Sequence, residues 1–499
     1  MKLLIANRGE IALRIIRTCR KLGIRTVIVH SDPDRDSLPA QYADERYSLS
    51  GATPADTYLN ISKIIHAARE TNCDYVHPGY GFLAEDARFV AACEENNLIF
   101  IGPPVVALER LANKLTARKT MRAAQVPVIP GSDEPVNGEE EAVNVAERIG
   151  YPVIIKAVYG GGGRGMRIAT NSNDVRRYFR LTRLESASAF GRDALYVEKQ
   201  LLGPRHVEIQ ALVDSHGKVV TLGERECSIQ RRHQKLLEEA PSAALNPDSR
   251  YRLSEAAKKG LSAARYMNAG TVEFLIDKSG DFYFLEVNKR LQVEHLVTEL
   301  TTGLDLVEEQ LKIASRERLT VSQNDVRING WAINCRINAE DPRRDFSPTP
   351  GTVARYQAAT GPGIRVDSAL YTGCVIPEFY DSLIVKLASH GRTRDEAIRR
   401  MKIALDEMEI VGVPTTISLH MAIMNDQKFQ AGNFDTGYLD DVLPRMNSQM
   451  LANERLAAAV AVASHHVIGN VPIQGALPAS RWRHTARAEA VGQNTATRW

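Results

Sequence analysis

Past the middle of the chain, two carboxylates, an amide and an arginine lie in or next to two segments with the composition of β-strands. Glu273 and Glu286 lie in two β-rich runs that flank Asp277-Lys278-Ser279-Gly280, a composition typical of a hairpin turn. In such a hairpin we expect the two glutamates to lie opposite each other, and the strand period of two places Asn288 and Arg290 on the face of Glu286. Hard oxygen ligands beside an arginine suit Mg²⁺ next to an anion site. A solvent-exposed, charged edge hairpin is the alternative interpretation.

A run of four glycines, residues 160–163, has the property that phosphate binding requires. Without Cβ atoms its backbone N–H groups can approach an anion closely, although no Gly-Lys-Ser/Thr follows as in a P-loop. Lys156 enters the run, and the pair Glu198-Lys199 ends a later strand. These features indicate a hinged lid over a nucleotide, with a flexible linker as the alternative. We expect Glu198 to accept from the adenine amino group, and backbone groups near Leu201 to complete the base contacts; Lys114 is a further candidate.

The segment Glu224–Lys235 is rich in charge, since seven of its twelve residues are charged or histidine. Its apolar flanks, Val219–Leu222 and Leu236-Leu237, indicate that it runs into the interior. Cations there need anions to offset the cost of burial. ATP phosphates and a small oxyanion would supply them, and a solvated strand edge is the alternative.

The elements that position these residues fall into several regions. At 499 residues the chain predicts two to four domains, and 44% hydrophobic and 25% charged residues are typical of a globular protein. A net charge of +3 argues against a nucleic-acid binder. The apolar runs are too short for a membrane span, Met1–Ala6 is too short for a signal peptide, and six scattered cysteines suggest neither disulfides nor a zinc site. We therefore expect a cytoplasmic protein.

Residues 1–112 alternate apolar strands with helical patterns, which predicts a doubly wound parallel sheet. The expected strands are Lys2–Ala6, Thr26–His30, Tyr75–His77 and Ile99–Gly102, and the expected helices are Ile11–Lys21, Ile61–Arg69 and Arg88–Asn96. Ligands of such sheets bind at the carboxyl ends of the strands. Asn7–Glu10 and His77–Phe82 both follow strand ends, although each could be only a tight turn.

The pattern of strands and helices changes from about Gly131. We expect lid strands at Tyr151–Ala157 and Ala194–Lys199, then long strands and a helix near Leu253–Arg265 within residues 205–330. Residues 331–446 have an α+β pattern, and residues 447–499 form a tail that could be helical over Leu451–Ala463 and then disordered. The fold class that follows is a multidomain α/β and α+β protein.

The chain resembles biotin carboxylase, an ATP-grasp enzyme, over about residues 1–446. The stretches that carry the resemblance are Ile5–Ala12, His77–Leu83, Gly160–Met166, Gln230–Lys235, Glu238–Pro241, Asn288–Glu299 and Cys335–Pro342. The resemblance implies a preATP-grasp domain over 1–112, an ATP-grasp domain over 113–330 with a mobile lid at 131–203, and a biotin-carboxylation domain over 331–446. It implies that ATP, bicarbonate and carrier-bound biotin yield carboxybiotin, ADP and phosphate through carboxyphosphate.

The same resemblance assigns roles to individual residues. The residues expected to contact ATP are Lys114, Lys156, Gly162, Gly163, Glu198, Lys199, Leu201, His206, Gln230 and His233. Those expected to hold Mg²⁺ or Mn²⁺ are Glu273, Glu286 and Asn288, and those expected around bicarbonate are Lys235, Arg290, Gln292 and Val293. Glu294 matches the general base, and Arg336 matches the residue that stabilises the biotin enolate.

The chain departs from the family pattern at Val158-Tyr159, where a small residue and a glycine are usual, and at Lys289, where Thr or Pro is usual. It also lacks the Met-Lys-Met biotinylation motif, so we expect the biotin carrier and the carboxyltransferase on separate chains, and the resemblance implies a homodimer. No nucleic-acid or membrane partner is expected.

Two alternative functions stay open. One is an ATP-grasp ligase that activates a different carboxylate, and the other is a non-catalytic subunit, for which Tyr159 is the only indication.

Overall fold

The computed structural model describes residues 1–159 and 165–446. Met1–Leu443 form one compact unit, and Pro444–Trp499 form a second, of which only residues 444–446 are described. The predicted tail at 447–499 and the glycines at 160–163 therefore lie outside the described residues.

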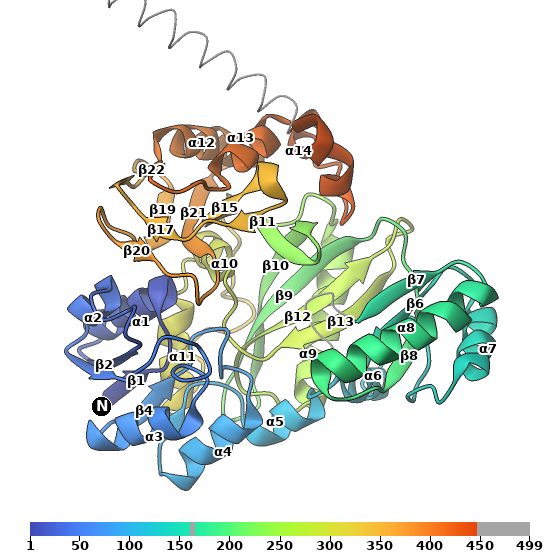
Figure 1. Ribbon diagram of the computed structural model, residues 1–499, viewed down its shortest axis with the longest axis horizontal. Coiled ribbons are helices and arrows are strands. Elements are labelled where there is room, and N and C mark those ends of the chain that lie inside the picture. The colour runs from blue at the N-terminus through green and yellow to red at the C-terminus, as the bar shows by residue number, and fades with distance from the viewer. Residues whose placement is uncertain (160–164, 447–499) are drawn as a thin grey trace, which may run out of the picture. The chain divides into compact units, whose positions relative to one another are not determined.

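The chain begins with a five-stranded parallel sheet of order β3-β2-β1-β4-β5 (Figure 1). Its elements are β1 (Lys2–Ile5), α1 (Gly9–Lys21), β2 (Arg25–His30), α2 (Leu38–Tyr42), β3 (Glu45–Ser48), α3 (Ile61–Glu70), β4 (Tyr75–His77), α4 (Ala87–Glu95), β5 (Ile99–Phe100) and α5 (Val105–Arg110). This confirms the predicted doubly wound sheet, and the expected strands and helices agree with it to within two residues.

Strand periodicity explains why helices cover both faces of this sheet. Leu3 and Ile5 pack in one apolar cluster with residues of α1, such as Ile15. Leu4 packs on the other face in a second cluster with residues of α3 and α4, such as Phe89. Because alternate side chains of a strand point to opposite faces, one fully buried strand supports both helical layers.

The loops after β1 and β4 meet at the carboxyl ends of their strands. The Asn7 side-chain amide donates to the carbonyls of Pro78 at 2.6 Å and Tyr80 at 2.8 Å. Gly79, at φ 63°, allows this approach, because a Cβ there would lie 2.8 Å from the amide nitrogen of Asn7. The two loops that the sequence places at strand ends therefore form one structure.

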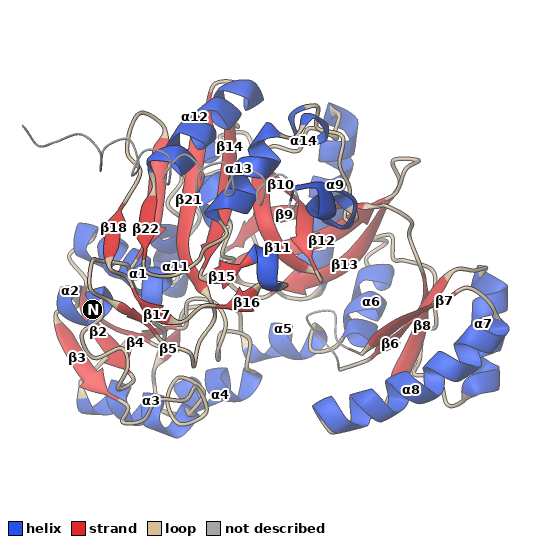
Figure 2. Cartoon of the chain, turned by 45° about the horizontal axis from the view of Figure 1, so that its top comes forward, coloured by secondary structure: helices blue, strands red, loops and turns tan. Residues whose placement is uncertain are grey.

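An eight-stranded sheet of order β13-β12-β9-β10-β11-β14-β21-β19 forms the centre of the unit (Figure 2). Its pairs are antiparallel. The strands and the helices around them are α6 (Lys114–Ala123), β9 (Arg205–Val213), β10 (Val219–Arg231), β11 (Gln234–Ala240), α9 (Pro247–Ala263), β12 (Asn268–Ile276), β13 (Phe282–Asn288), α10 (His295–Thr302), α11 (Leu306–Ala314), β14 (Trp331–Asn338), β19 (Ile364–Ser368) and β21 (Leu383–Gly391). The β11–β14 pairing makes the sheet continuous across the predicted boundary at residue 330.

The region predicted as a lid has its own sheet and core. The sheet has the order β7-β6-β8, and α7 and α8 pack against it and against each other. These elements are α7 (Glu139–Ile149), β6 (Val153–Ala157), β7 (Met166–Ala169), α8 (Ser172–Phe190) and β8 (Leu195–Lys199). Its apolar side chains form a separate cluster that includes Val153, Ile155 and Phe179. A separate core is what a segment that moves as a body requires.

The last part of the unit adds short strands and three helices to β14, β19 and β21. They are β15 (Glu340–Asp341), the 3₁₀ helix η1 (Pro342–Arg344), β16 (Ser347–Pro348), β17 (Gly351–Thr352), β18 (Arg355–Gln357), β20 (Val375–Ile376), α12 (Arg394–Glu407), β22 (Glu409–Val411), α13 (Ile417–Asn425) and α14 (Gln427–Gln430). The α+β class predicted for this region is confirmed. Among the described residues, no helix has the length and apolar character needed to cross a membrane. The exact domain boundaries stay predictions.

Candidate functional site

The β12–β13 hairpin has the register that the sequence predicts. Glu273 pairs directly with Glu286, and Thr271 pairs with Asn288. The Asn288 amide donates to Glu273 at 2.6 Å, and the Arg290 guanidinium donates to the Asn288 oxygen at 3.2 Å. β13 ends at Asn288, so Arg290 joins this group from the loop that follows the strand.

The Lys235 side chain lies at the centre of the site. Its ammonium contacts Glu208 at 2.5 Å, Glu273 at 2.7 Å and Glu294 at 2.8 Å. Burial alone would lower the pKa of this lysine, but the three carboxylates raise it well above its usual value. Lys235 is therefore a fixed positive charge that joins β9, β11, β12 and the segment before α10.

Glu294, the expected general base, is buried between two cations. One carboxylate oxygen accepts from Lys235 at 2.8 Å, and the other accepts from the Arg336 guanidinium at 2.9 Å. Burial opposes ionisation, but Lys235 and then Arg336 outweigh it, so the pKa of Glu294 is lowered. Glu294 is therefore ionised at neutral pH, which a base requires.

Glu238 binds the Arg336 guanidinium and fixes its orientation. Its buried carboxylate accepts from Arg336 Nε at 2.5 Å and from the Asn334 amide at 2.7 Å. Burial would lower the pKa of Arg336, but Glu238 and Glu294 raise it above the usual value. The guanidinium is thereby oriented with its Nε on Glu238 and one terminal nitrogen on Glu294.

Two buried residues that the sequence analysis did not select complete this network. Arg225, 0% exposed, donates to Glu208 and to the Gln292 amide oxygen, and it reaches Gln210 at 2.7 Å. Gln292 in turn donates to Glu208 at 3.2 Å. The sequence does contain a signal for Glu208, because polar and apolar residues alternate at period two along His206–Ala211.

The cross-strand carboxylates have opposite pKa shifts. The pKa of Glu273 is lowered well below its usual value, because Lys235 and His206 outweigh the effect of burial. The pKa of Glu286 is raised, first by desolvation and then by the Glu273 charge. His206 Nε2 lies 2.9 Å from Glu273, and His206, Glu208 and Glu273 bring potential ligand atoms within 4.8 Å of one another. Like charges held side by side favour a bound cation.

Glu198, predicted to contact the nucleotide, is buried and forms ion pairs with two cations. Lys156 contacts one oxygen at 2.5 Å, and Arg118 contacts the other. Arg118 was missed, although it follows Lys114 by one helical turn on α6 and so shares its face. The pKa of Lys114 is lowered, by burial and then by the Lys156 charge.

The remaining residues predicted to contact ATP or bicarbonate differ in position and burial. The Lys199 ammonium donates to the carbonyls of Gly150 at 3.0 Å and Tyr151 at 2.8 Å, and so points toward the α7–β6 connection. Gln230 pairs with Lys235 across the β10–β11 hairpin, and His233 is exposed at its tip. Leu201 and Val293 are half-buried, and Gly162 and Gly163 lie outside the described residues. The roles given to all these residues stay predictions.

The unusual pair Val158-Tyr159 divides its side chains between core and surface. Val158, 3% exposed, packs with Leu115 and Tyr196. Tyr159 is exposed, and the Arg192 guanidinium lies 4.3 Å from its ring centroid. Tyr159 therefore has a partner within the region predicted as a lid.

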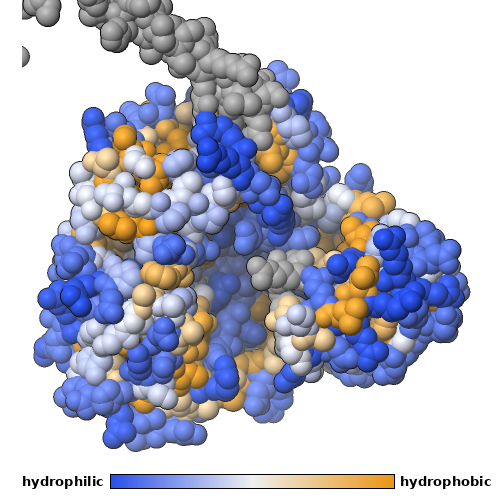
Figure 3. All heavy atoms as spheres, in the orientation of Figure 1, coloured by the Kyte–Doolittle hydropathy of each residue, from blue (hydrophilic) through white to orange (hydrophobic). Residues whose placement is uncertain are grey.

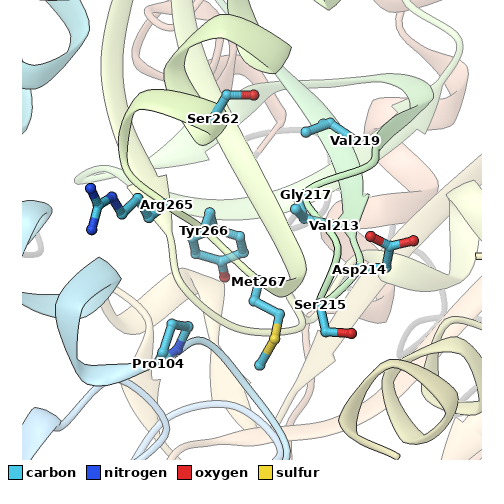
Figure 4. Close-up of a pocket in the computed structure, with 10 residues that line it drawn as sticks. All are labelled: Pro104, Val213, Asp214, Ser215, Gly217, Val219, Ser262, Arg265, Tyr266 and Met267. Carbon is cyan, nitrogen blue, oxygen red and sulfur yellow. The ribbon is translucent and has the colours of Figure 1, made fainter. Parts of the chain in front are cut away.

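The surface agrees with this location of the site. Figure 3 shows a hollow whose floor is hydrophilic over β9, β10 and β12. A separate pocket of about 340 Å³, shown in Figure 4, contains Asp214 and Tyr266, whose polar atoms bond to backbone groups nearby. Of the site residues that the structure describes, none lines this pocket. The hydrophilic hollow is therefore the candidate site.

Three family models match the chain in order. Residues 1–108 match the biotin carboxylase N-terminal domain, residues 113–322 match the ATP-binding domain of the carbamoyl-phosphate synthase L chain, and residues 334–441 match the biotin carboxylase C-terminal domain. Together they cover most of the chain.

Curated proteins and solved structures give similar results. Biotin carboxylase 1 of Bacillus subtilis is 50% identical over 440 residues, which is 88% of this chain and 98% of that protein. A pyruvate carboxylase subunit of Methanothermobacter thermautotrophicus is 49% identical over 449 residues, covering 90% and 91%. The biotin carboxylase domain dimer of Hydrogenobacter thermophilus 2-oxoglutarate carboxylase, solved with MgADP, ADP and bicarbonate, superposes with a TM-score of 0.86 at 46% identity, covering 89% of this chain and 98% of that one.

Proposed function

The chain belongs to the biotin carboxylase family, and from this premise we propose how its residues carboxylate biotin on a separate carrier protein with ATP and bicarbonate. It is an ATP-grasp ligase. Its reaction converts ATP, bicarbonate and biotin into ADP, phosphate and carboxybiotin through carboxyphosphate. The observation that carries the assignment of roles is the position of Glu294 between Lys235 and Arg336.

Bicarbonate becomes an effective nucleophile when it loses its remaining proton. We assign that proton to Glu294, whose lowered pKa keeps it ionised and able to accept. Lys235 and Arg290 would hold the anion in line with the γ-phosphate, and Gln292 and Val293 would complete its surroundings. The support is proximity, since the Lys235 ammonium lies within 2.8 Å of Glu294 and the Arg290 guanidinium lies beside Asn288.

A divalent cation fits the hairpin carboxylates. Glu273 and Glu286 lie directly opposite each other, and the raised pKa of Glu286 reflects desolvation and the negative charge of Glu273. We propose that these two residues and the Asn288 oxygen hold Mg²⁺ or Mn²⁺. Such an ion, when bound, neutralises charge on the phosphoryl group.

The nucleotide would lie between the hairpin and the lid. We assign Lys156, Lys114, His206, Gln230 and His233 to it. The base contacts are assigned to Glu198, Lys199 and Leu201. The lid strand β6 carries Lys156, and closure of the lid would exclude water from carboxyphosphate. Its glycines 162 and 163 are assigned to the phosphates because of their residue type.

Arg336 acts in the second half of the reaction. When carboxyphosphate breaks down to CO₂ and phosphate, the released phosphate takes the proton of the biotin ureido nitrogen, the ureido oxygen gains negative charge, and the nitrogen then bonds to the carbon of CO₂. The Arg336 guanidinium, held by Glu238, would stabilise that oxyanion. The contact between Arg336 and Glu294 brings the two half-reactions to the same carboxylate.

We propose that the carrier and the carboxyltransferase are separate chains, and that the enzyme acts as a homodimer in the cytoplasm. A dimer is supported by the relative from Hydrogenobacter thermophilus, which is solved as one. The cytoplasm is supported by the six cysteines, which are all buried free thiols. Relatives are named for pyruvate and 2-oxoglutarate, so we assign the choice of acceptor to the carboxyltransferase.

Steady-state turnover of the purified protein tests this function. ADP release should require bicarbonate and should rise when free biotin is added. Glu294→Gln and Arg336→Ala should abolish carboxylation and leave ATP binding intact, whereas Glu317→Gln and Arg318→Ala, changes of the same type at exposed positions, should have no effect. Unchanged carboxylation in both site variants would refute the assigned roles.

A further inference from the structure

Two turns with unusual backbone conformations meet beside the proposed site. The β10–β11 hairpin turns at Arg232 and His233, with φ values of 48° and 65°. The segment after η1 contains Asp345 and Phe346, with φ values of 53° and 58°. A residue with a side chain loses about 1 kcal/mol or more in the left-handed region. Four such residues in two adjacent turns therefore need compensating contacts, and strain of this kind gathers at functional sites.

Arginines supply those contacts. The Arg231 guanidinium lies 4.2 Å from the Phe346 ring centroid and donates to the Asp345 carbonyl at 3.2 Å and to its carboxylate. Arg232 donates to the same carboxylate at 3.0 Å. One aspartate therefore fastens the hairpin to the segment after η1, and Arg231, whose side chain is 16% exposed, is the anchor.

The second turn repeats the pattern. Asp341 contacts Arg343 at 3.0 Å and Arg344 at 3.8 Å. We call these four arginines, Arg231, Arg232, Arg343 and Arg344, with Asp341 and Asp345, the arginine rim. Its outer charges are Arg232 and Arg344, whose side chains are 70% and 83% exposed.

The arginine rim lies at the ends of the strands that carry Lys235 and Arg336. Lys235 follows Arg232 by three residues in the same hairpin and pairs with Gln230. The register that pairs Leu237 with Cys335 makes Arg336 the next residue toward the rim on β14. Figure 2 shows β11, β15 and β16 close together at this end of the sheet. A biotin that reaches Arg336 while attached to a protein brings that protein against the rim.

We propose that the arginine rim docks the biotin-bearing carrier, and that it selects a carrier surface that is acidic around the biotinylated lysine. This rests on the proposed function. Opposite charges raise the rate of encounter and orient the partner, and salt screens the effect. Free biotin has no such surface, so its carboxylation does not depend on the rim.

Three synthetic peptides of equal length test the docking proposal. Each contains one biotinyl-lysine, flanked by acidic, neutral or basic residues. The full-length enzyme should turn them over with kcat/KM in the order acidic, neutral, basic, with about tenfold between the extremes at about 0.1 M salt, and the order should collapse at about 1 M salt.

The double variant Arg232→Gln with Arg344→Gln should lower kcat/KM for the acidic peptide about threefold to tenfold and raise it for the basic one, with free biotin unchanged. Arg318→Gln with Arg399→Gln removes the same charge at exposed positions away from the rim and should change none of these values. Equal kcat/KM for the three peptides, or an equal loss with free biotin, would overturn the docking proposal. Absence of turnover with free biotin and with every peptide would overturn the proposed function, and the docking proposal with it.

Discussion

Replacement of Arg225 by methionine tests whether one buried guanidinium organises the site. Arg225 is 0% exposed and donates to acceptors on β9, on β12, before α10 and on α10: Glu208, Gln210, Thr271, Gln292 and Thr298. Methionine fills similar space but donates to none of them. Removal of one partner of a buried ion pair costs about 3–5 kcal/mol. Lys235 still compensates Glu208, so we expect about 3–4 kcal/mol.

This energy converts into a measurable fall in Tm. For the compact unit Met1–Leu443, an unfolding entropy of about 2 cal/mol/K per residue gives a fall of about 4 °C. Gln292 also loses its donor, so the KM for bicarbonate should rise about tenfold while the KM for ATP stays the same. Thermal denaturation followed by circular dichroism and steady-state ADP release measure the two effects. Arg318→Met is the matched exposed control. A Tm within about 1 °C of the parent, with an unchanged KM for bicarbonate, would show that Arg225 does not organise the site.

Single substitutions at Glu10, Arg118 and Lys289 test three other features of the structure. Burial raises the pKa of the Glu10 carboxyl from 4.5 to about 7. Its protonated form therefore stabilises the fold below about pH 4.5, and that contribution is lost as the pH rises to about 7. Glu10→Gln should remove roughly 3 kcal/mol of this pH dependence, which a flatter plot of Tm against pH would show. Arg118→Met should free the Glu198 carboxylate from one cation and raise the KM for ATP about tenfold with kcat maintained, and an unchanged KM would contradict its assignment to the nucleotide side. Lys289→Met should change the KM for ATP less than about threefold, because its ammonium makes a 3.2 Å bond to the Leu111 carbonyl away from the carboxylates, and a loss of turnover would show a direct role.

Local periodicity made the site hairpin predictable. The turn composition between two β-rich runs fixes the pairing of Glu273 with Glu286, and the structure has that register. The same reasoning located the parallel sheet, because buried strands that alternate with amphipathic helices admit few arrangements. Family motifs selected Lys235, Glu294 and Arg336, which the structure brings into contact.

Contacts that depend on tertiary packing were not predictable in the same way. Arg225 belongs to a charged segment, and nothing local shows that its guanidinium joins four elements. Glu198 was expected to face the adenine amino group, but its oxygens are engaged by Lys156 and by Arg118, from a helix distant in sequence. The β11–β14 pairing likewise joins strands separated by α9 to α11 and two other strands.

Transfer of an oxygen atom from bicarbonate to phosphate tests whether Glu294 activates bicarbonate for attack on ATP. If Glu294 removes the proton of bicarbonate and the resulting anion attacks the γ-phosphate, one bicarbonate oxygen must remain on the phosphate when carboxyphosphate decomposes. With ¹⁸O-labelled bicarbonate, mass spectrometry of the phosphate released by the parent enzyme should show one ¹⁸O per turnover, and Glu294→Gln should release no labelled phosphate above background. Unlabelled phosphate from the parent enzyme, or labelled phosphate from Glu294→Gln at the parent rate, would contradict the account.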